Sequence, residues 1–171
     1  TVVAGMTMLL AGEKGCQASI LAPTEILARQ HYEHLEHYAR ALNLRVEILT
    51  GTTKAKDKKR ILDELEHGKI DMLIGTHALI EPTVVFKNLG LVVIDEQHRF
   101  GVAQRAALWK KNEWPPHILV MTATPIPRTL AMTLYGDLDY SVIDELPPGR
   151  KPINTMHFFY THREKCFELL K

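Results

Sequence analysis

The stretch LVVIDEQHRFG, residues 91–101, decides the fold of this chain. Its four leading apolar residues, three of them β-branched, predict a strand buried on both faces, which is typical of a central strand in a parallel sheet. Two carboxylates, Asp95 and Glu96, follow at the carboxyl end of this strand. Ligands bind at that end of open α/β sheets, because the strand ends and the loops after them form a crevice there. The stretch therefore predicts a ligand site at residues 95 and 96 in preference to a solvated turn.

The two acids suit different steps of nucleotide hydrolysis. Magnesium keeps several of its waters and takes only one or two carboxylates together with nucleotide phosphates, so Asp95 suits a magnesium site. Glu96 can then orient or deprotonate the water that attacks the phosphate. The residues alone thus predict a magnesium-dependent nucleotide hydrolase.

The composition fits a globular protein and leaves the partner open. The chain has 171 residues, 46% of them hydrophobic and 24% charged, which gives room for one substantial core and the beginning of a second domain. A formal net charge of +1 does not indicate a nucleic-acid binder, which normally carries a basic domain or patch. Cys16 and Cys166 lie far apart without a C-x-x-C pair, so we expect neither a zinc site nor a disulfide framework, and a cytoplasmic location. No apolar run approaches the roughly 18 residues of a membrane span, so we expect no membrane partner.

Short apolar strands alternate with helices along the chain. Strands are predicted at residues 18–22, 45–49, 71–74, 91–94, 117–121 and 140–143, and helices at 2–12, 24–42, 54–68 and 102–110. At least six strands in this alternation predict an α/β fold with a mostly parallel sheet covered by helices on both faces. The prolines of residues 146–152 indicate a stiff linker between a first domain, residues 1–145, and a second domain, whose start at 153–171 reads as a strand at 153–160 and a helix from residue 162. Because the chain begins without methionine inside one predicted helix and stops inside another, we expect it to be part of a longer protein.

Three segments carry further expectations. Apolar residues surround nearly the whole helix at 2–12, so we expect that helix to be buried. In the helix at 24–42 the predicted buried stripe consists of Leu27, His31, Leu35, Tyr38 and Leu42. His31, His34 and His37 fan out over a third of the circumference, so we expect no metal site among them. The basic run at 54–60 predicts a solvated face, with a contact to a DNA backbone left open.

The acid pair belongs to a longer pattern with a known counterpart. DEQH at residues 95–98 resembles the Walker B box, or motif II, of superfamily 2 helicases, and DEQHRFGVAQR at 95–105 resembles the RecG branch-migration helicases in particular. APTEILA at 22–28 resembles motif Ia, GTHALI at 75–80 resembles motif Ib, and TAT at 122–124 resembles motif III. PIPRTLA at 125–131 narrows the resemblance to the RecG helicases and the transcription-repair coupling translocases. Thr1 matches the last residue of the phosphate-binding G-x-G-K-T loop.

This resemblance implies a fold, a reaction and partners. The chain would form the first RecA-like domain of a two-domain P-loop NTPase motor that uses ATP and Mg²⁺. Such a motor would move along branched double-stranded DNA, such as stalled forks and Holliday junctions, in recombination and repair. The implied partners are this DNA and a second RecA-like domain of the same chain, and we expect a monomer. The chain by itself is expected to be inactive, because it lacks the lysine of the phosphate loop and the arginines of the partner domain.

The resemblance also implies roles for individual residues. The implied nucleotide-site residues are Thr1 and Asp95 for Mg²⁺, Glu96 for the attacking water, and Gln97 and His98 for sensing the γ-phosphate. The implied contacts to the DNA backbone are Pro23, Thr24, Gly51, Thr76 and His77. The implied coupling residues between the two sites are Thr122, Ala123 and Thr124, and His98 is the expected hydrogen-bond partner of the two threonines.

Two alternative functions stay open at this point. A transcription-repair coupling translocase would share the FGV and TATPIPRTL segments but usually carries DEEH, so Gln97 favours the RecG side. A non-hydrolytic module that docks DNA or protein would predict a degraded acid pair, whereas both carboxylates are intact here.

Overall fold

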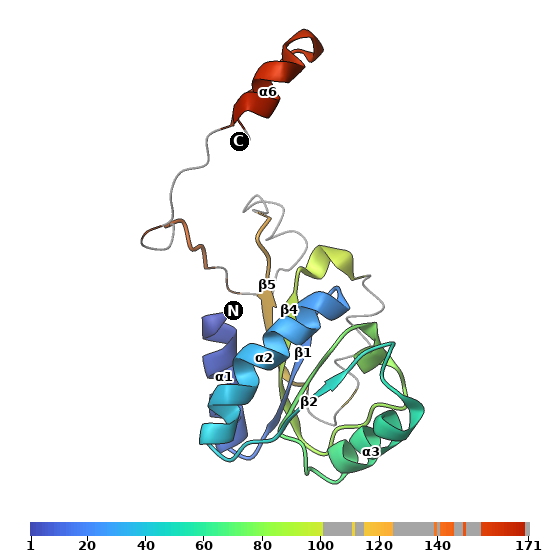
Figure 1. Cartoon of the computed structure of the whole chain (residues 1–171). Coiled ribbons are helices and arrows are strands. Elements are labelled where there is room, and N and C mark those ends of the chain that lie inside the picture. Colours follow the sequence, from blue (N-terminus) through green and yellow to red (C-terminus); the bar gives the residue numbers. More distant parts are fainter. Residues whose placement is uncertain are drawn as a thin grey trace. The chain divides into compact units, whose positions relative to one another are not determined.

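The computed structural model describes residues 1–100, 111, 115–124, 139, 141–145, 149 and 155–169. For residues 98 and 166 it describes the backbone alone. The chain divides into two compact units, Thr1–Ile126 and Pro127–Lys171. The first unit contains the sheet, and the described part of the second unit contains a short 3-10 helix, Tyr160–His162, followed by one α-helix (Figure 1).

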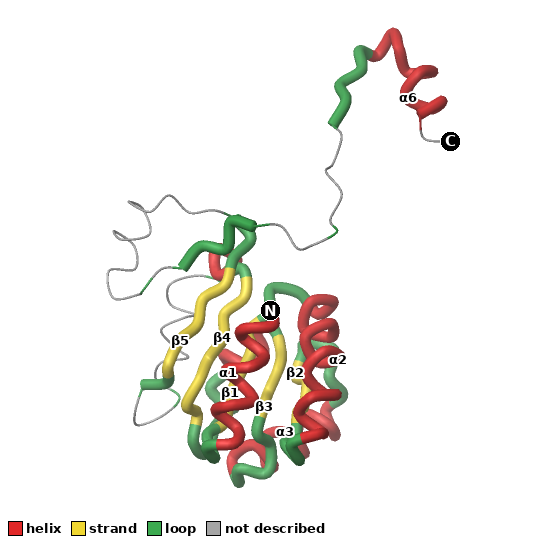
Figure 2. Tube along the Cα trace, turned by 90° about the vertical axis from the view of Figure 1, so that its left-hand side faces the viewer, coloured by secondary structure: helices red, strands yellow, loops and turns green. Residues whose placement is uncertain are grey.

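A five-stranded parallel sheet forms the centre of the first unit (Figure 2). Its strands are β1 (Gln17–Leu21), β2 (Val46–Leu49), β3 (Met72–Gly75), β4 (Leu89–Asp95) and β5 (His117–Met121). Their order is β2-β3-β1-β4-β5, and every neighbouring pair is parallel. The chain leaves β1 on one side and later crosses to β4 on the other side, so the order reverses between these two strands. That point is where ligands bind in sheets of this kind.

Helices cover both faces of this sheet (Figures 1 and 2). The helices α1 (Val2–Glu13) and α2 (Glu25–Ala41) pack on one face, in a core that includes Met8, Leu35 and Val93. The helix α3 (Ala55–Glu66) packs on the other face, in a core that includes Ile61, Leu65 and Val92. In the second unit, α6 spans Arg163–Leu169. None of the helices in the described ranges is long and apolar enough to span a membrane.

β4 presents alternate residues to the two faces, as any strand does. Val92 and Ile94 belong to the core beneath α3, whereas Leu91 and Val93 belong to the core beneath α1 and α2. Asp95 continues the second series. Its carboxylate therefore faces the side of the sheet that carries α1 and α2.

A buried glutamine closes the opposite, amino-terminal edge of the sheet. Gln17 is 5% exposed, and its Nε2 donates to the carbonyls of Leu65 at 2.9 Å and Ile70 at 2.8 Å. Its Oε1 accepts from the amides of Lys87 at 2.7 Å and Asn88 at 2.9 Å. One side chain thus satisfies four backbone groups, from the end of α3, from the loop after it and from the loop before β4.

The predicted fold class is confirmed, and most of the predicted elements occur within a few residues of their expected bounds. The predicted strands at 140–143 and 153–160 are wrong, because their described residues, 141–143 and 155–159, lie outside any strand. Their large apolar side chains are exposed, for example Ile143 at 87% and Phe159 at 71%. The predicted helix at 102–110 and most of the predicted linker at 146–152 lie outside the described residues.

The expected burial of two helices also needs correction. α1 buries only one side and exposes Val2, Val3, Met6 and Leu10 by 55–76% on the other, because the sheet covers a single face of the helix. The buried face of α2 consists of Ala28, His31, Leu35 and Ala39, whereas Tyr38 is 61% exposed. The small alanines allow α2 to lie close to the sheet, and this shifts the contact away from the larger residues.

Candidate nucleotide and DNA site

The carboxyl edge of the sheet gathers the predicted site residues of five separate loops. Because all five strands are parallel, the segments that follow them emerge at the same edge. In the order of the strands across the sheet, these segments contain Gly51, Thr76 with His77, Pro23 with Thr24, Asp95 with Glu96, and Thr122–Thr124. The first three groups were predicted to contact DNA, the fourth to act on the nucleotide, and the fifth to couple the two sites.

Asp95 is held by a buried histidine from α2. The Nε2 atom of His31 lies 2.9 Å from Oδ2 of Asp95, and the two side chains are 6% and 17% exposed. An ionised carboxylate has no hydrogen to give, so the imidazole is the donor. Within the described part of the chain, no other residue bonds to this carboxylate. The contact leaves the second oxygen, Oδ1, available to a ligand.

The side chain of Glu96 is held by the segment TAT, which directly follows the neighbouring strand β5. The hydroxyl of Thr122 donates to Oε2 of Glu96 at 2.8 Å, and the amide of Ala123 donates to Oε1 at 3.2 Å. The amide of Glu96 donates to the carbonyl of Met121 at 2.8 Å. The backbone of Glu96 is left-handed, with φ 49° and ψ 54°. Such a conformation costs a non-glycine residue about 1–2 kcal/mol and is found preferentially at functional sites.

The expected contact of the TAT threonines with His98 involves a side chain outside the described ones, so it stays a prediction. The hydroxyl of Thr122 donates to Glu96. The reason is the register of the two strands, which pairs Asp95 with Met121 and so brings the next residues, Glu96 and Thr122, side by side. Thr122 also accepts from the amide of Thr124 at 3.1 Å. Gln97 is 3% exposed at the start of a short 3-10 turn, Gln97–Arg99, and its predicted role in sensing the γ-phosphate stays a prediction, as does that of His98.

The pair Thr1 and Asp95 fits a magnesium ion by its chemistry. Both offer hard oxygen ligands, and Mg²⁺ takes few such ligands from protein because phosphates and waters supply the rest. Thr1 is exposed at the start of α1, and its side chain makes no capping hydrogen bond. α1 begins at the carboxyl edge of the sheet and lies on the face toward which Asp95 points (Figure 2). Among the described residues, no group of three or more His, Cys, Asp or Glu could hold a metal, so any bound Mg²⁺ would rely on a small donor set.

Two of the predicted DNA loops are tied to each other. Oε2 of Glu25, the first residue of α2, accepts from the hydroxyl of Thr52 at 2.9 Å, and Oε1 accepts from the amide of Thr52 at 3.2 Å. Thr24 caps α2, because its hydroxyl accepts from the amide of Leu27 at 3.3 Å. The loop after β1 and the loop after β2 therefore form one surface, which includes the exposed Gly51.

The third predicted DNA loop follows Gly75, a position at which the packing of the strands requires glycine. A Cβ at Gly75 would clash with the backbone carbonyl of Leu49, so only glycine allows β3 to end this close to β2. Next to it, Thr76 is only 2% exposed, whereas His77 is exposed. If this loop contacts DNA, the side chain that can reach it is that of His77.

The basic run 54–60 is solvated, as predicted, and its charge is partly neutralised. Lys58 donates to Glu81 at 2.7 Å, and this hydrogen bond holds the pKa of Glu81 below its usual range. Arg60 donates to Glu47 at 2.9 Å. Burial works to raise the pKa of Glu47, but hydrogen bonds from Arg60 and Arg45 outweigh it and lower that pKa. The remaining exposed cations of the run are Lys54, Lys56 and Lys59.

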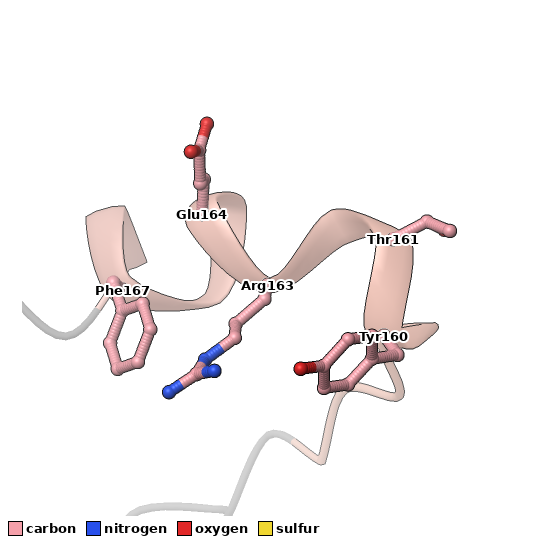
Figure 3. Close-up of a pocket in the computed structure, with 5 residues that line it drawn as sticks. All are labelled: Tyr160, Thr161, Arg163, Glu164 and Phe167. Atoms are coloured by element: carbon pink, nitrogen blue, oxygen red, sulfur yellow. The ribbon is translucent and has the colours of Figure 1, made fainter.

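The second unit contains a shallow surface pocket that includes none of the predicted site residues. It is lined by Tyr160, Thr161, Arg163, Glu164 and Phe167 (Figure 3). The guanidinium carbon of Arg163 lies 5.3 Å from the centroid of the Phe167 ring, a cation–π contact. This contact stabilises the first turns of α6 locally.

Sequence reasoning missed the contact between His31 and Asp95. The stripe prediction placed this residue on the buried face of its helix, and a buried polar side chain needs a hydrogen-bond partner. A histidine on the buried face of a helix that covers the sheet could have suggested such a contact, because Asp95 is an acid at the end of a strand in that sheet.

The sheet order and the acid pair at the end of β4 define a RecA-like helicase domain. The family profile described as DEAD/DEAH box helicase matches residues 1–133, and the chain belongs to this family. Here the four letters of the box are DEQH.

Individual relatives narrow the similarity further. The chain is 54% identical over 171 residues to the ATP-dependent DNA helicase RecG of Synechocystis sp., covering 100% of this chain and 20% of that protein. It is 49% identical over 169 residues to the RecG of Aquifex aeolicus, covering 98% of this chain and 21% of that protein. The chain thus spans about a fifth of the length of these relatives.

Solved structures agree with these sequence comparisons. A structure of RecG bound to a three-way DNA junction matches with a TM-score of 0.83 and 45% identity, over 99% of this chain and 22% of that one. The Mycobacterium smegmatis helicase Lhr, solved with single-stranded DNA and AMP-PNP, matches with a TM-score of 0.57 and 17% identity, over 68% of this chain and 16% of that one. At that identity the second match supports the fold alone.

Proposed function

We propose that the protein to which this chain belongs is an ATP-dependent double-stranded DNA translocase that remodels branched DNA in recombination and repair. The observation that carries the proposal is the intact acid pair, with Asp95 held by His31 and Glu96 held by Thr122 and Ala123. Both carboxylates are fixed at the sheet edge where nucleotides bind. The similarity to RecG helicases, one of them solved on a three-way junction, supports the choice of DNA as substrate.

The nucleotide would bind with Mg²⁺, which supplies positive charge to the phosphates when bound. Thr1 and Asp95 would hold the ion. Glu96 would orient the attacking water and accept its proton, while Gln97 and His98 would sense the γ-phosphate. The bonds from Thr122 and Ala123 keep the Glu96 carboxylate in one place, which fits a base that must meet a water in a fixed geometry.

The DNA backbone would lie over the loops that contain Pro23, Thr24, Gly51, Thr76 and His77. The first RecA-like domain would extend over residues 1–145, followed by a linker at 146–152 and by a second RecA-like domain that starts at residue 153. That second domain would complete the ATP site with arginines. We expect the protein to act as a monomer in the cytoplasm.

The transcription-repair coupling translocases are the second candidate function, because they share the TATPIPRTL segment. Gln97 in place of a second glutamate favours the RecG side. A docking module without hydrolysis has weaker support, since it would not need two positioned carboxylates.

Hydrolysis of ATP by the full-length protein on different DNA substrates tests the proposal. We expect phosphate release to be strongly stimulated by three-way and four-way junctions, less by linear duplex, and to be accompanied by unwinding of the junctions. A Glu96→Gln variant serves as the control for contaminating ATPases. Hydrolysis without junction unwinding would favour the transcription-coupling alternative, and an absence of hydrolysis would overturn the proposal.

A further inference from the structure

The contact between His31 and Asp95 joins two parts of the site that the sequence motifs treat separately. His31 belongs to α2, the helix that starts directly after the predicted DNA contacts Pro23 and Thr24. Asp95 ends β4 and is the predicted magnesium ligand. The two residues are 64 positions apart in sequence, and their side-chain atoms are 2.9 Å apart.

The surroundings of His31 leave it little freedom to turn elsewhere. Its side chain is 6% exposed, and it sits on the buried face of α2 between Ala28 and Leu35. The small side chain of Ala28 keeps α2 close to the sheet, so the imidazole reaches β4. On the strand, the alternation of side chains points Asp95 toward α2. The geometry is thus set by the packing of the helix on the sheet.

A carboxylate with one oxygen bound to a fixed donor presents its other oxygen in a defined direction. Oδ2 of Asp95 accepts from His31, which leaves Oδ1 to face an ion or one of the waters of that ion. Partners of this kind orient metal-binding groups, and their removal typically costs about 10- to 100-fold in metal affinity or activity.

We propose that His31 is a positioning residue that holds Asp95 for the magnesium–nucleotide complex and connects it mechanically to the start of α2. This inference rests on the proposed function, because it assigns the nucleotide site to Asp95. His31 contacts neither nucleotide nor DNA itself. It acts only through the carboxylate that it holds.

The helical geometry of α2 supports the connection. From Glu25 to His31 the helix rises about 9 Å at 1.5 Å per residue, so fewer than two turns separate its first residue from the bond to Asp95. The first turn is fixed by the Thr24 cap and by the hydrogen bond that Glu25 accepts from the Thr52 hydroxyl. If DNA binding shifted the amino-terminal end of α2, the first two turns would move together, and with them the hydrogen bond from His31 to Asp95. Magnesium binding should therefore respond to DNA.

Two amide substitutions separate positioning from mere packing. In His31→Gln the side-chain amide can occupy the place of Nε2 and still donate to Asp95. In His31→Asn the amide is one carbon shorter and cannot reach. Both variants carry a polar, uncharged side chain of related size, so a simple loss of packing would affect both. His34→Asn on the same helix is the matched control, because His34 is exposed.

The experiment measures binding of a fluorescent ATP analogue to the full-length protein while MgCl₂ is titrated, first without DNA. We expect the half-saturating Mg²⁺ concentration to rise about tenfold in His31→Asn, in line with the loss of other orienting partners. It should stay near the wild-type value in His31→Gln and His34→Asn. Binding of the analogue in EDTA should be the same in all four proteins.

The same titration with a DNA duplex present tests the connection to α2. DNA should lower the half-saturating Mg²⁺ concentration in the wild type and in His31→Gln, and this effect should be absent in His31→Asn. If the wild type responds and His31→Asn responds equally, or if the wild type does not respond, the connection is wrong.

The outcomes also separate this inference from the proposed function. Equal Mg²⁺ dependence in His31→Asn and wild type would overturn the positioning role while leaving the nucleotide site in place. An equal loss in both amide variants would assign His31 to packing and would likewise overturn the role. If the wild type shows no Mg²⁺-dependent binding of the analogue at all, the proposed function itself fails.

Discussion

Asp95 and Glu96 are adjacent in the chain, yet their side chains have different neighbours and should therefore respond differently to mutation. Glu96→Gln keeps the shape and can keep both contacts, because its Oε1 can accept from the Ala123 amide while its Nε2 donates to the Thr122 hydroxyl, but it cannot accept a proton from water. We expect this variant of the full-length protein to bind nucleotide almost normally and to lose turnover. Asp95→Asn removes the negative charge next to the predicted ion, so it should weaken the Mg²⁺-dependent part of nucleotide binding.

Equilibrium binding and steady-state hydrolysis, measured side by side for both variants, check this division of roles. Nucleotide binding in EDTA is the internal control, because neither substitution should change it. If both variants lost nucleotide affinity to the same degree, the roles of the two acids would have to be reassigned.

Gln17 provides a prediction about stability alone. Gln17→Leu removes four hydrogen bonds and leaves the backbone groups of Leu65, Ile70, Lys87 and Asn88 without that partner. Each buried polar group left unsatisfied costs about 1–3 kcal/mol, and relaxation recovers part of the sum, so we expect a loss of about 3 kcal/mol in the free energy of unfolding. Urea unfolding followed by circular dichroism measures it.

The exposed Gln30 supplies the matched control, because Gln30→Leu makes the same chemical change on the surface of α2. It should change the free energy of unfolding by less than about 0.5 kcal/mol. A similar small effect for Gln17→Leu would mean that water replaces the lost bonds.

Single residues show how far the sequence could predict the site. The acid pair was predictable because it ends an apolar strand, and the structure places it at the carboxyl edge of the sheet as expected. The partners of these acids were not, since they depend on the crossing of α2 over the sheet and on the register between β4 and β5. Neither the crossing of the helix nor the register of the strands can be predicted from a local sequence pattern.

At the level of elements, strands were predictable where a neighbouring strand exists to receive them. The five strands of the sheet all have apolar runs and a parallel neighbour. Residues 141–143 have a similar apolar pattern, but they are exposed and pair with nothing among the described residues. Strand propensity reflects packing against neighbours more than a preference of the backbone, so such a segment can be misjudged from its sequence alone.

The segment TAT gives a prediction at the level of an element. The double variant Thr122→Ala, Thr124→Ala removes the hydroxyl that donates to Glu96 but keeps the amide of Ala123 as a second donor. We expect ATP and DNA binding to stay nearly normal and hydrolysis to remain measurable, while junction unwinding falls much further. The measured quantity is the number of junctions unwound per ATP consumed by the full-length protein.

Thr161→Ala is a suitable control, because this threonine is exposed in the second unit and bonds only to the ring of His162 within the described ranges. An unchanged ratio of unwinding to hydrolysis in the double variant, with both rates reduced together, would make the TAT segment structural and would place the coupling elsewhere.

The first unit presents its predicted nucleotide and DNA residues along one edge, and this arrangement predicts how DNA binds. The predicted DNA loops offer backbone groups and hydroxyls, and α3, which follows the loop after β2, adds exposed cations such as Lys56 and Lys59. These groups suit phosphates and not base edges. Binding of the full-length protein to duplex DNA should therefore weaken steeply with added salt and depend little on sequence. Fluorescence anisotropy with two unrelated duplexes at several salt concentrations measures both properties. A shallow salt dependence or a clear preference for one duplex would contradict the assignment.

The strand order β2-β3-β1-β4-β5 also determines when strands can pair while the chain is being synthesised on the ribosome. β1 and β2 are made before β3, but they are not neighbours, and each pairs with β3. None of these five strands can therefore form a pair until Met72–Gly75 has left the exit tunnel. Up to that moment β1 and β2 have no partner among these five strands, and unpaired strands expose apolar surface that chaperones bind. β3 pairs with both β1 and β2, so we expect these three strands to join once its four residues have emerged.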